Sequence, residues 1–364
     1  RWVMVHKKDP ATPTGEADAP EVPGAVEASQ LHVPGSLDLS GFETWATGGK
    51  AFFDDYAVGE RGLKTVLMAG HVMRDVDASG PGPRPMQWMD TFGIDSGHDY
   101  DPFWAKCVEL KVAPPSHASS RALGPRRSPS NYVYNHVGHF AASCEALCKS
   151  LFMGGVTRRF PTLNFAFLEG GAGWACSLYS DMVAHWRKRN PEALLKNLDP
   201  KLLDRDGLME LISRYGDEII TARLEELRES LGHIEGRPAS IDDWAACGIE
   251  RAEEIHDLFV PRFYIGCEAD DPLNAWAFNS KINPFGAKLR AVLGSDISHW
   301  DVPDMRDVVA EAYELVESDV ITDEDFRDFV FTNPAKLHAG MNPDFFKGTR
   351  VETAVAQFLK EETN

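Results

Sequence analysis

Leu163-Asn164-Phe165-Ala166-Phe167-Leu168-Glu169-Gly170-Gly171 is the stretch that decides the fold. Its apolar run has the length of a buried strand, and it ends in a carboxylate followed by two glycines. A helical pattern over 172–188 follows directly. Strands that are apolar on both faces and alternate with helices are typical of a parallel sheet covered by helices. The sequence therefore predicts an α/β fold.

Before and after this stretch, expected strands alternate with expected helices. The N-terminal 1–50 are rich in Pro, Gly, Ala and Glu without a helical or strand period, which predicts an extended arm. Further strands are expected at 2–6, 64–70, 112–117, 262–268 and 289–296. Helices are expected at 51–59, from Asp101, at 131–153, at 191–232, from Pro303 and from Thr322. The apolar stripe of the 131–153 helix, which is expected to be buried, consists of Val133, Val137, Phe140, Cys144, Leu147, Cys148 and Leu151.

Three of the expected strands end in an ionisable side chain, namely His117, Glu169 and Asp296. In a TIM-type (β/α)8 barrel, the carboxyl ends of the strands face one mouth, where the chemistry takes place. We therefore predict such a barrel over 51–345, with a helical insertion at 191–260 and a C-terminal tail at 346–364. Too few strands precede His117 to close it, so we expect a barrel that lacks its N-terminal strands.

The amino-acid composition limits the kinds of molecule that this protein is expected to bind. The 364 residues carry 37 Lys and Arg against 56 Asp and Glu, a formal net charge of −19, which disfavours a nucleic-acid partner. No apolar run reaches the roughly 18–20 residues of a membrane span, and the N-terminus does not have the pattern of a signal peptide. Six scattered cysteines fit reduced, buried thiols. We expect a cytoplasmic protein with no nucleic-acid or membrane partner.

A histidine and two carboxylates at one mouth are suitable ligands for a divalent metal ion. The alternative is that His117, Glu169 and Asp296 are hydrogen-bonded polar residues that close the strands. Spacing alone leaves both interpretations open, because the three positions are scattered along the chain.

Four motifs carry a resemblance to a known family. They are DPFWAKCVEL from Asp101, RRFPTLNFAFLEGGAGW from Arg158, LGSDISHWDVPDM from Leu293 and DFRDFVFTNPAKLH from Asp325. Together they resemble the metal-dependent amidohydrolase superfamily, in the amidohydrolase 2 branch that includes aminocarboxymuconate-semialdehyde and resorcylate decarboxylases. The likeness covers roughly 55–345 and implies a distorted TIM barrel with one divalent metal, zinc or in some members manganese.

The resemblance also implies roles for single residues. His117 matches the metal-binding histidine at the end of the family's fifth strand. Asp296 matches the aspartate at the end of the eighth strand, which binds the metal and accepts a proton from its water. A metal lowers the pKa of bound water toward 7, and a nearby carboxylate accepts the proton as hydroxide attacks.

Two departures from the family pattern matter. Glu169 stands where the decarboxylases have a histidine, and it is expected to act as a metal ligand, as a general base or in binding substrate. The family's first strand ends in His-x-His or Glu-x-His, and no such pair precedes His117. We expect that this pair lies upstream of Arg1, with a partner chain supplying the early strands as the alternative.

Other candidates surround the predicted mouth. His299 follows Asp296 by three positions and is expected to contact substrate, with a hydrogen bond to the loop as the alternative. His136 and His139, three apart at the start of a helix, and Glu268 at a strand end are expected to bind substrate. The alternatives are that the two histidines are solvated or cap the helix, and that the Glu268 carboxylate hydrogen-bonds a metal ligand without touching substrate. His71 is a weaker candidate.

These observations predict an enzyme, a metal-dependent hydrolase of C–N or C–C bonds that acts on a small organic molecule. Asp296, Glu169 and His299 are its expected catalytic residues, and His117 and Asp296 its metal ligands. The alternatives are a non-oxidative decarboxylase, which is a carbon–carbon lyase, and a metal-free binding or scaffold protein. We expect a homodimer or larger homo-oligomer, with the 191–232 helices as a cap or a subunit interface.

Overall fold

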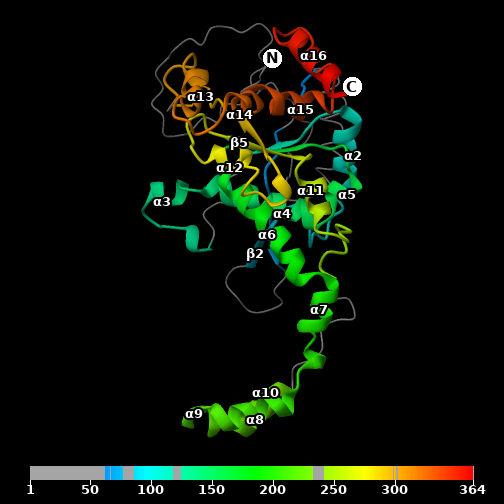
Figure 1. The fold of residues 1–364 in the computed structure, drawn as a ribbon, viewed down its shortest axis with the longest axis vertical. Helices are drawn as coiled ribbons and strands as arrows, with labels where there is room; N and C mark the ends of the chain where they lie inside the picture. The colour runs from blue at the N-terminus through cyan, green and yellow to red at the C-terminus, as the bar shows by residue number, and fades with distance from the viewer. Residues whose placement is uncertain are drawn as a thin grey trace. The chain divides into compact units, whose positions relative to one another are not determined.

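The computed structural model describes residues 62–65, 67–76, 86–117, 124–232, 242–297, 299–300 and 302–363. The chain divides into two compact units, Arg1–Thr65 and Val66–Asn364, and the fold given below is that of the second unit. The predicted arm at 1–50, the strand at 2–6 and the helix at 51–59 lie outside the described residues. Strands and helices of the second unit follow one another along the chain, as Figure 1 shows.

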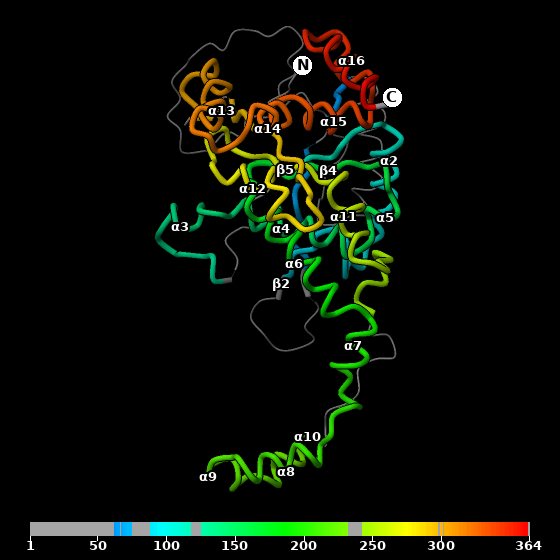
Figure 2. Tube along the Cα trace, in the orientation of Figure 1, coloured from blue at the N-terminus to red at the C-terminus, as the bar shows by residue number. Residues whose placement is uncertain are grey.

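A parallel sheet forms the centre of the fold. Its strands β3 (Pro115–Ser116), β4 (Phe165–Phe167), β5 (Phe263–Cys267) and β6 (Arg290–Leu293) lie side by side in that order. The chain passes from β4 to β5 through the helices α6 to α11, which can be followed in Figure 2. The predicted parallel α/β class is confirmed, and the TIM-type barrel that lacks its N-terminal strands stays a prediction.

The strand expected at 64–70 is reduced to one bridge. Met68 pairs with Ser116 in parallel, and its backbone exchanges hydrogen bonds with Pro115 and His117, at 2.9 and 3.2 Å. Its neighbour Leu67 is 60% exposed, so the apolar run is not buried as predicted. Met68 therefore continues the sheet beyond β3 by a single residue.

One face of the sheet is aromatic. Phe165, Phe167 and Phe263 are buried, and register places Phe165 opposite Phe263. Trp104 packs edge-on against Phe165 at 5.4 Å between ring centroids, and Phe259 packs edge-on against Phe263 at 4.9 Å. Burying a phenylalanine contributes about 1.5–3 kcal/mol, so this aromatic layer is a major source of stability.

The opposite face is built from the alternate residues. Ala166, Tyr264 and Val292 form one cluster with Ala113 and Leu337, all buried. Leu337 belongs to α15 (Asn333–Ala339), so the last part of the chain covers this face. The two faces differ because successive side chains of a strand point in opposite directions.

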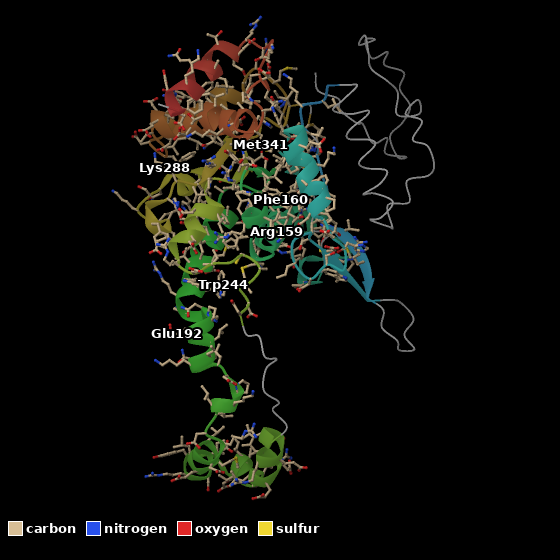
Figure 3. All side chains as sticks on the ribbon, turned by 90° about the vertical axis from the view of Figure 1, so that its right-hand side faces the viewer. Arg159, Phe160, Glu192, Trp244, Lys288 and Met341 are labelled. Carbon is tan, nitrogen blue, oxygen red and sulfur yellow. The ribbon has the colours of Figure 1, made fainter. Side chains whose placement is uncertain are left out.

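The helix expected from Asp101 is α2 (Asp101–Leu110), with a proline in its first turn as predicted, and α6 (Gly173–Arg189) matches the pattern over 172–188. Arg159 of α5 (Val156–Arg159) forms two hydrogen bonds of 2.8 Å with Asp101, which joins α5 to α2 (Figure 3). The expected helix at 131–153 is broken into α3 (Tyr132–His136) and α4 (His139–Met153).

Gly138 makes this break, because its φ of +69° lies in the left-handed region that a helix interior does not allow. The break turns α3 away from the core, which leaves Val133 64% and Val137 70% exposed. The prediction that these two valines belong to the buried stripe was therefore wrong. Cys144, Leu147, Cys148 and Leu151 of the same stripe are buried in α4 as expected.

The stretch expected to be helical at 191–232 is helical. It contains α7 (Pro191–Asn197), the short turn η4 (Pro200–Leu202), α8 (Arg205–Tyr215), α9 (Glu218–Thr221) and α10 (Leu224–Gly232). The chain returns past Trp244, whose Nε1 donates to the Arg189 carbonyl at 3.0 Å, and continues into α11 (Glu253–Phe259). Trp244 and Glu192 are both labelled in Figure 3.

The last helices begin partly where expected. α14 (Asp323–Arg327) starts at a complete capping box of Thr322 and Asp325, as predicted. α13 (Val308–Glu317) begins five residues after Pro303, and the predicted tail contains α16 (Glu352–Thr363). The remaining elements are the antiparallel pair β1 (Val72–Val76) and β2 (Met86–Asp90), α12 (Asn274–Phe278), the turns η3 (Gly124–Arg126) and η5 (Pro284–Gly286), and the π-helical turn η6 (Asp328–Thr332).

The six cysteines are free and buried, in agreement with the sequence. Burial raises the pKa of Cys107 and of Cys144 to about 12, so neither is a reactive thiolate at neutral pH. Within the part of the chain that the structure describes, every helix is too short or too polar to cross a membrane.

Candidate functional site at the carboxyl edge of the sheet

Ionisable residues follow the carboxyl ends of all four parallel strands. His117 comes directly after β3, Glu169 two residues after β4, Glu268 directly after β5 and Asp296 three residues after β6. Because the strands are parallel, these positions lie along the same edge of the sheet. The structure therefore places the sequence-predicted residues on one edge.

His117 and Glu169 form a direct pair, in which His117 Nε2 and Glu169 Oε2 share a short hydrogen bond. The side chains are 35% and 22% exposed, so both members of the pair are partly accessible to solvent. The hydrogen bond that Glu169 accepts raises the pKa of His117, burial opposes this rise, and the charges of Glu169 and Asp296 add to it. The imidazole of His117 therefore tends to hold its proton.

Asp296 and His299 form the second pair, with 3.3 Å between Asp296 Oδ2 and His299 Nδ1. A backbone hydrogen bond of 3.0 Å from His299 N to the Asp296 carbonyl closes the turn that brings the two side chains together. The His299 side chain therefore contacts the Asp296 carboxylate, and its expected contact with substrate stays a prediction. Two imidazole–carboxylate pairs therefore lie at this edge, and Asp296 also acts electrostatically on His117.

Both site carboxylates have unusual backbones. Glu169 has φ +62° and Asp296 has φ +42°, in the left-handed region that side chains other than glycine rarely adopt. Such a conformation costs about 1–3 kcal/mol and is found preferentially at functional sites, where it aims a side chain. The sequence pattern predicts no such strain, although Gly170, directly after Glu169, and Gly294, two residues before Asp296, are typical of sharp turns.

Gly266 on β5 allows β4 to turn at Glu169. A Cβ on Gly266 would lie 2.9 Å from Leu168 Cα and 3.1 Å from the Phe167 carbonyl oxygen, too close for any side chain. Its own carbonyl accepts a hydrogen bond from Gly171 at 3.2 Å. The missing side chain of Gly266 therefore sets the path of the loop that carries Glu169.

His136 and His139 lie on the two sides of the helix break, with 4.4 Å between their ring centroids. Burial lowers the pKa of His139, and the positive charges of His136 and His117 lower it further, against the opposing effect of Glu169. His139 therefore holds a proton less readily than an ordinary histidine. The electrostatic influence of Glu169 and His117 on it shows that this pair belongs to the same neighbourhood.

Phe140 is the site residue that sequence analysis missed, because it was assigned to the buried stripe of a helix. Its ring lies 4.0 Å from His139, 4.6 Å from His117 and 6.0 Å from His136 between centroids. It thus forms an apolar wall against three imidazoles. An aromatic residue directly after a predicted site histidine was the signal available in the sequence.

The remaining candidates lie on the same edge without a described role. Glu268 is exposed, and its carbonyl accepts from Asn274 Nδ2 at 2.9 Å. His71, three residues after the Met68 bridge, is 7% exposed. A cavity of 470 Å³ lies between α12 and α14, and none of the predicted site residues lines it.

The residues at this edge are of the chemical types that bind a metal ion, but they are too few to hold one. Imidazole and carboxylate groups are the ligands that zinc and manganese accept. Catalytic zinc sites use three protein ligands, and among the described residues no group of three or more His, Cys, Asp and Glu side chains is arranged to hold an ion. His117 Nε2 is also engaged with Glu169. His117 and Asp296 alone do not complete a metal centre.

The known proteins that match this sequence align with a part of the chain other than the candidate site. No family model matches the sequence. Over 61 residues it is 38% identical to a beta-methylmalyl-CoA dehydratase of Chloroflexus aurantiacus and 41% identical to a mesaconyl-CoA hydratase of Cereibacter sphaeroides. The match covers 17% of this chain and 17% and 18% of those proteins, so the chain spans less than a fifth of the relatives it matches. The matched stretch is N-terminal and lies outside the described residues.

Proposed function

We propose that the carboxyl edge of the sheet is the active site of a hydrolase that acts on a small organic molecule. The observation that carries this proposal is the pair of imidazole–carboxylate contacts, His117–Glu169 and His299–Asp296, held by two carboxylates in the left-handed conformation. Hydrolysis needs one group that takes a proton from water and another that gives a proton to the leaving group. The two pairs supply one of each.

Asp296 is the proton acceptor in this proposal. Its carboxylate, held beside His299, takes a proton from water as the water oxygen forms a bond to the substrate carbonyl carbon. His117 then donates its proton to the leaving nitrogen or carbon as that bond breaks. The raised pKa of His117 keeps this proton in place at neutral pH, and Glu169 holds the imidazole in position. Phe140 supplies an apolar wall for the substrate.

A divalent metal is the part of the proposal that rests on the resemblance to amidohydrolases. His117 and Asp296 would hold a zinc or manganese ion, with further ligands needed beyond these two. The ion would supply Lewis-acid activation by lowering the pKa of a bound water toward 7. An imidazole nitrogen that binds a metal ion gives up its proton, so the proton-donor role of His117 belongs to the site without the ion, whereas Asp296 would accept a proton from water in either case.

The test measures metal content and activity on the full chain. Purified protein would be analysed for bound zinc and manganese, then assayed with carboxamides, esters and β-diketones before and after chelation. We expect hydrolysis in the parent and loss of hydrolysis in Asp296→Asn. Asp304→Asn, on the same segment and paired with Arg306, is the matched control and should keep the parent rate. A parent that hydrolyses none of these compounds would contradict the proposal.

Decarboxylation is the alternative reaction of the same site. It needs protonation of a carbanion as CO2 leaves, and His117 is again the group that holds a proton. Aromatic carboxylic acids added to the same protein would release CO2 in this case. Because Glu169 is anionic and cannot polarise a carbonyl as an imidazolium does, we place hydrolysis first.

Hydration of a CoA thioester is a second candidate function, favoured by the N-terminal match to the dehydratase and the hydratase. Mesaconyl-CoA would be the substrate to assay, since one matched protein is named for it. Such an activity would belong to the N-terminal stretch, so Asp296→Asn and His117→Asn should leave it unchanged. Loss of hydration in these variants would place it at the carboxyl edge instead.

A further inference from the structure

Three polar side chains form a row at the amino edge of the sheet, opposite the proposed active site. Asn164 directly precedes β4, Arg262 directly precedes β5, and Arg290 is the first residue of β6. Each stands two positions before a strand residue of the buried cluster that contains Leu337. Side chains two positions apart in an extended chain share a face, so the row runs across three neighbouring strands on that face.

Neighbouring side chains hold the two arginines of this row in place. Arg262 Nη1 donates to Asn164 Oδ1 at 3.2 Å, and Asn164 is itself fixed by its hydrogen bonds to two carbonyls of α15. Arg290 Nη1 donates to the hydroxyl oxygen of Tyr264, a residue that is 0% exposed. The guanidinium carbon of Arg290 also lies 5.0 Å from the centroid of the Tyr264 ring. Both guanidinium groups are therefore positioned by the fold.

Neither arginine has an acidic partner among the residues that the structure describes. Within that part of the chain, the guanidinium of Arg262 donates only to Asn164, and that of Arg290 only to Tyr264. A guanidinium carries five N–H donors, so most donors of both groups remain available. The chain has 56 Asp and Glu against 37 Lys and Arg, and this excess of acids makes two neighbouring arginines without a carboxylate unusual.

The two positive charges act on each other. Burial lowers the pKa of Arg262, Tyr264 opposes this change, and the charge of Arg290 lowers the pKa further. Both arginines are only partly exposed, so water screens their repulsion less than it would on an open surface. Charges that leave water are ordinarily paired with an opposite charge. An anion that contacts both guanidinium groups would supply that charge and remove the repulsion.

We propose that Arg262 and Arg290 bind a small oxyanion of the phosphate type at the amino edge of the sheet. Guanidinium groups bind phosphate oxygens through paired N–H···O hydrogen bonds, and two of them match the charge of roughly −1.5 to −2 on a phosphate monoester at neutral pH. The Tyr264 hydroxyl accepts from Arg290 and still has its own proton to donate to an oxygen of the anion. A carboxylate has one charge and two oxygens, which suffice for one arginine only. This site is independent of the reaction proposed for the carboxyl edge.

The first test is titration calorimetry of the full chain with inorganic phosphate, at an ionic strength held constant with chloride. We expect one phosphate per chain, and a midpoint of thermal unfolding that rises by about 2–4 °C at ten times Kd. Acetate should bind at least about tenfold more weakly. Phenyl phosphate with the Kd of inorganic phosphate would identify the phosphate group of a larger molecule as the ligand, and a weaker phenyl phosphate would identify the free ion. A phosphate effect no larger than that of chloride, or acetate as tight as phosphate, would overturn the proposal.

The second test assigns the binding to these two residues. Arg262→Gln and Arg290→Gln should each raise the phosphate Kd by about tenfold or more, with an unchanged circular dichroism spectrum. Arg290→Lys keeps the charge but not the planar fork, so its Kd should lie between those of the parent and Arg290→Gln. Arg214→Gln is the matched control, since Arg214 of α8 lies 5.1 Å from the Tyr215 ring much as Arg290 lies over Tyr264, and it should keep the parent Kd. Phosphate that binds both glutamine variants as tightly as the parent, or a control that weakens binding equally, would overturn the proposal.

Discussion

The two edges of the parallel sheet are built from the same strands. They differ in how the polar side chains at each edge are hydrogen-bonded and exposed. At the amino edge, Asn164 Nδ2 donates to the Lys336 and Leu337 carbonyls of α15, at 3.2 and 3.1 Å, while its Oδ1 accepts from Arg262 at 3.2 Å. At the carboxyl edge, Glu169 and Asp296 are charged, partly exposed and held in the left-handed conformation.

One histidine near each edge, His338 and His117, shows the same contrast. His338 of α15 is stacked on Phe345 at 4.2 Å, and burial lowers its pKa to about 4, so it is a neutral core residue. His117 is paired with a carboxylate, and its pKa is raised. An edge whose polar groups are hydrogen-bonded to one another stabilises the fold, whereas an edge with partly exposed carboxylates in strained backbone costs stability and supports chemistry.

The largest expected effect is the loss of activity when a residue of the carboxyl edge is changed. Asp296→Asn keeps the shape of the side chain but removes the proton acceptor, so kcat should fall by about 10²-fold or more. Rate assays and circular dichroism on parent and variant would measure it. A folded variant with a rate within a few-fold of the parent would remove Asp296 from the mechanism.

The next effect belongs to the amino edge and should act on stability alone. Asn164→Ala leaves the Arg262 guanidinium and two α15 carbonyls without their partner, which should lower the free energy of unfolding by about 2–3 kcal/mol. Urea denaturation would measure the change. The rate of the folded variant at low temperature should equal that of the parent, and a loss of rate comparable to that of Asp296→Asn would show that the two edges are not separable.

A smaller effect compares left-handed residues at the two edges. Lys111, with φ +56°, ends α2 just before β3 and is exposed. Lys111→Gly should raise the free energy of unfolding by up to about 1 kcal/mol without changing the rate. Glu169→Gly relieves the same strain but loses the His117 hydrogen bond, so it should gain less stability and lose activity. Equal behaviour of the two glycine variants in both assays would mean that Glu169 is only a turn residue.

The smallest effect is on the pH dependence of stability. Because the folded pKa of His117 lies above its ordinary value, its contribution to stability is complete below about pH 6.5 and is lost as pH rises through the folded pKa. Glu169→Gln removes the carboxylate that raises the pKa of His117. Between neutral and mildly alkaline pH, the free energy of unfolding of the parent should therefore fall relative to that of this variant. Parallel stability curves over that range would show that the pair does not hold a proton.

Local sequence was informative about elements whose signals are short-range. The proline at the start of α2, the capping box of Thr322 and Asp325 and the apolar runs of β4 and β5 are all found in the structure. The helix over 131–153 was predicted as continuous because its apolar spacing holds across Gly138. Spacing cannot show that one glycine adopts a left-handed conformation, so the exposure of Val133 and Val137 could not be predicted.

The sequence by itself determined that His117, Glu169 and Asp296 follow strands of this chain, because apolar runs and the polar residues after them are local patterns. Only the tertiary structure decided which of these residues meet. His117 and Glu169 are 52 positions apart and pair because β3 and β4 are neighbours, and Glu169 is aimed by the absence of a side chain on Gly266 of β5. Such contacts depend on strand order and on close packing between distant segments, which no local pattern contains.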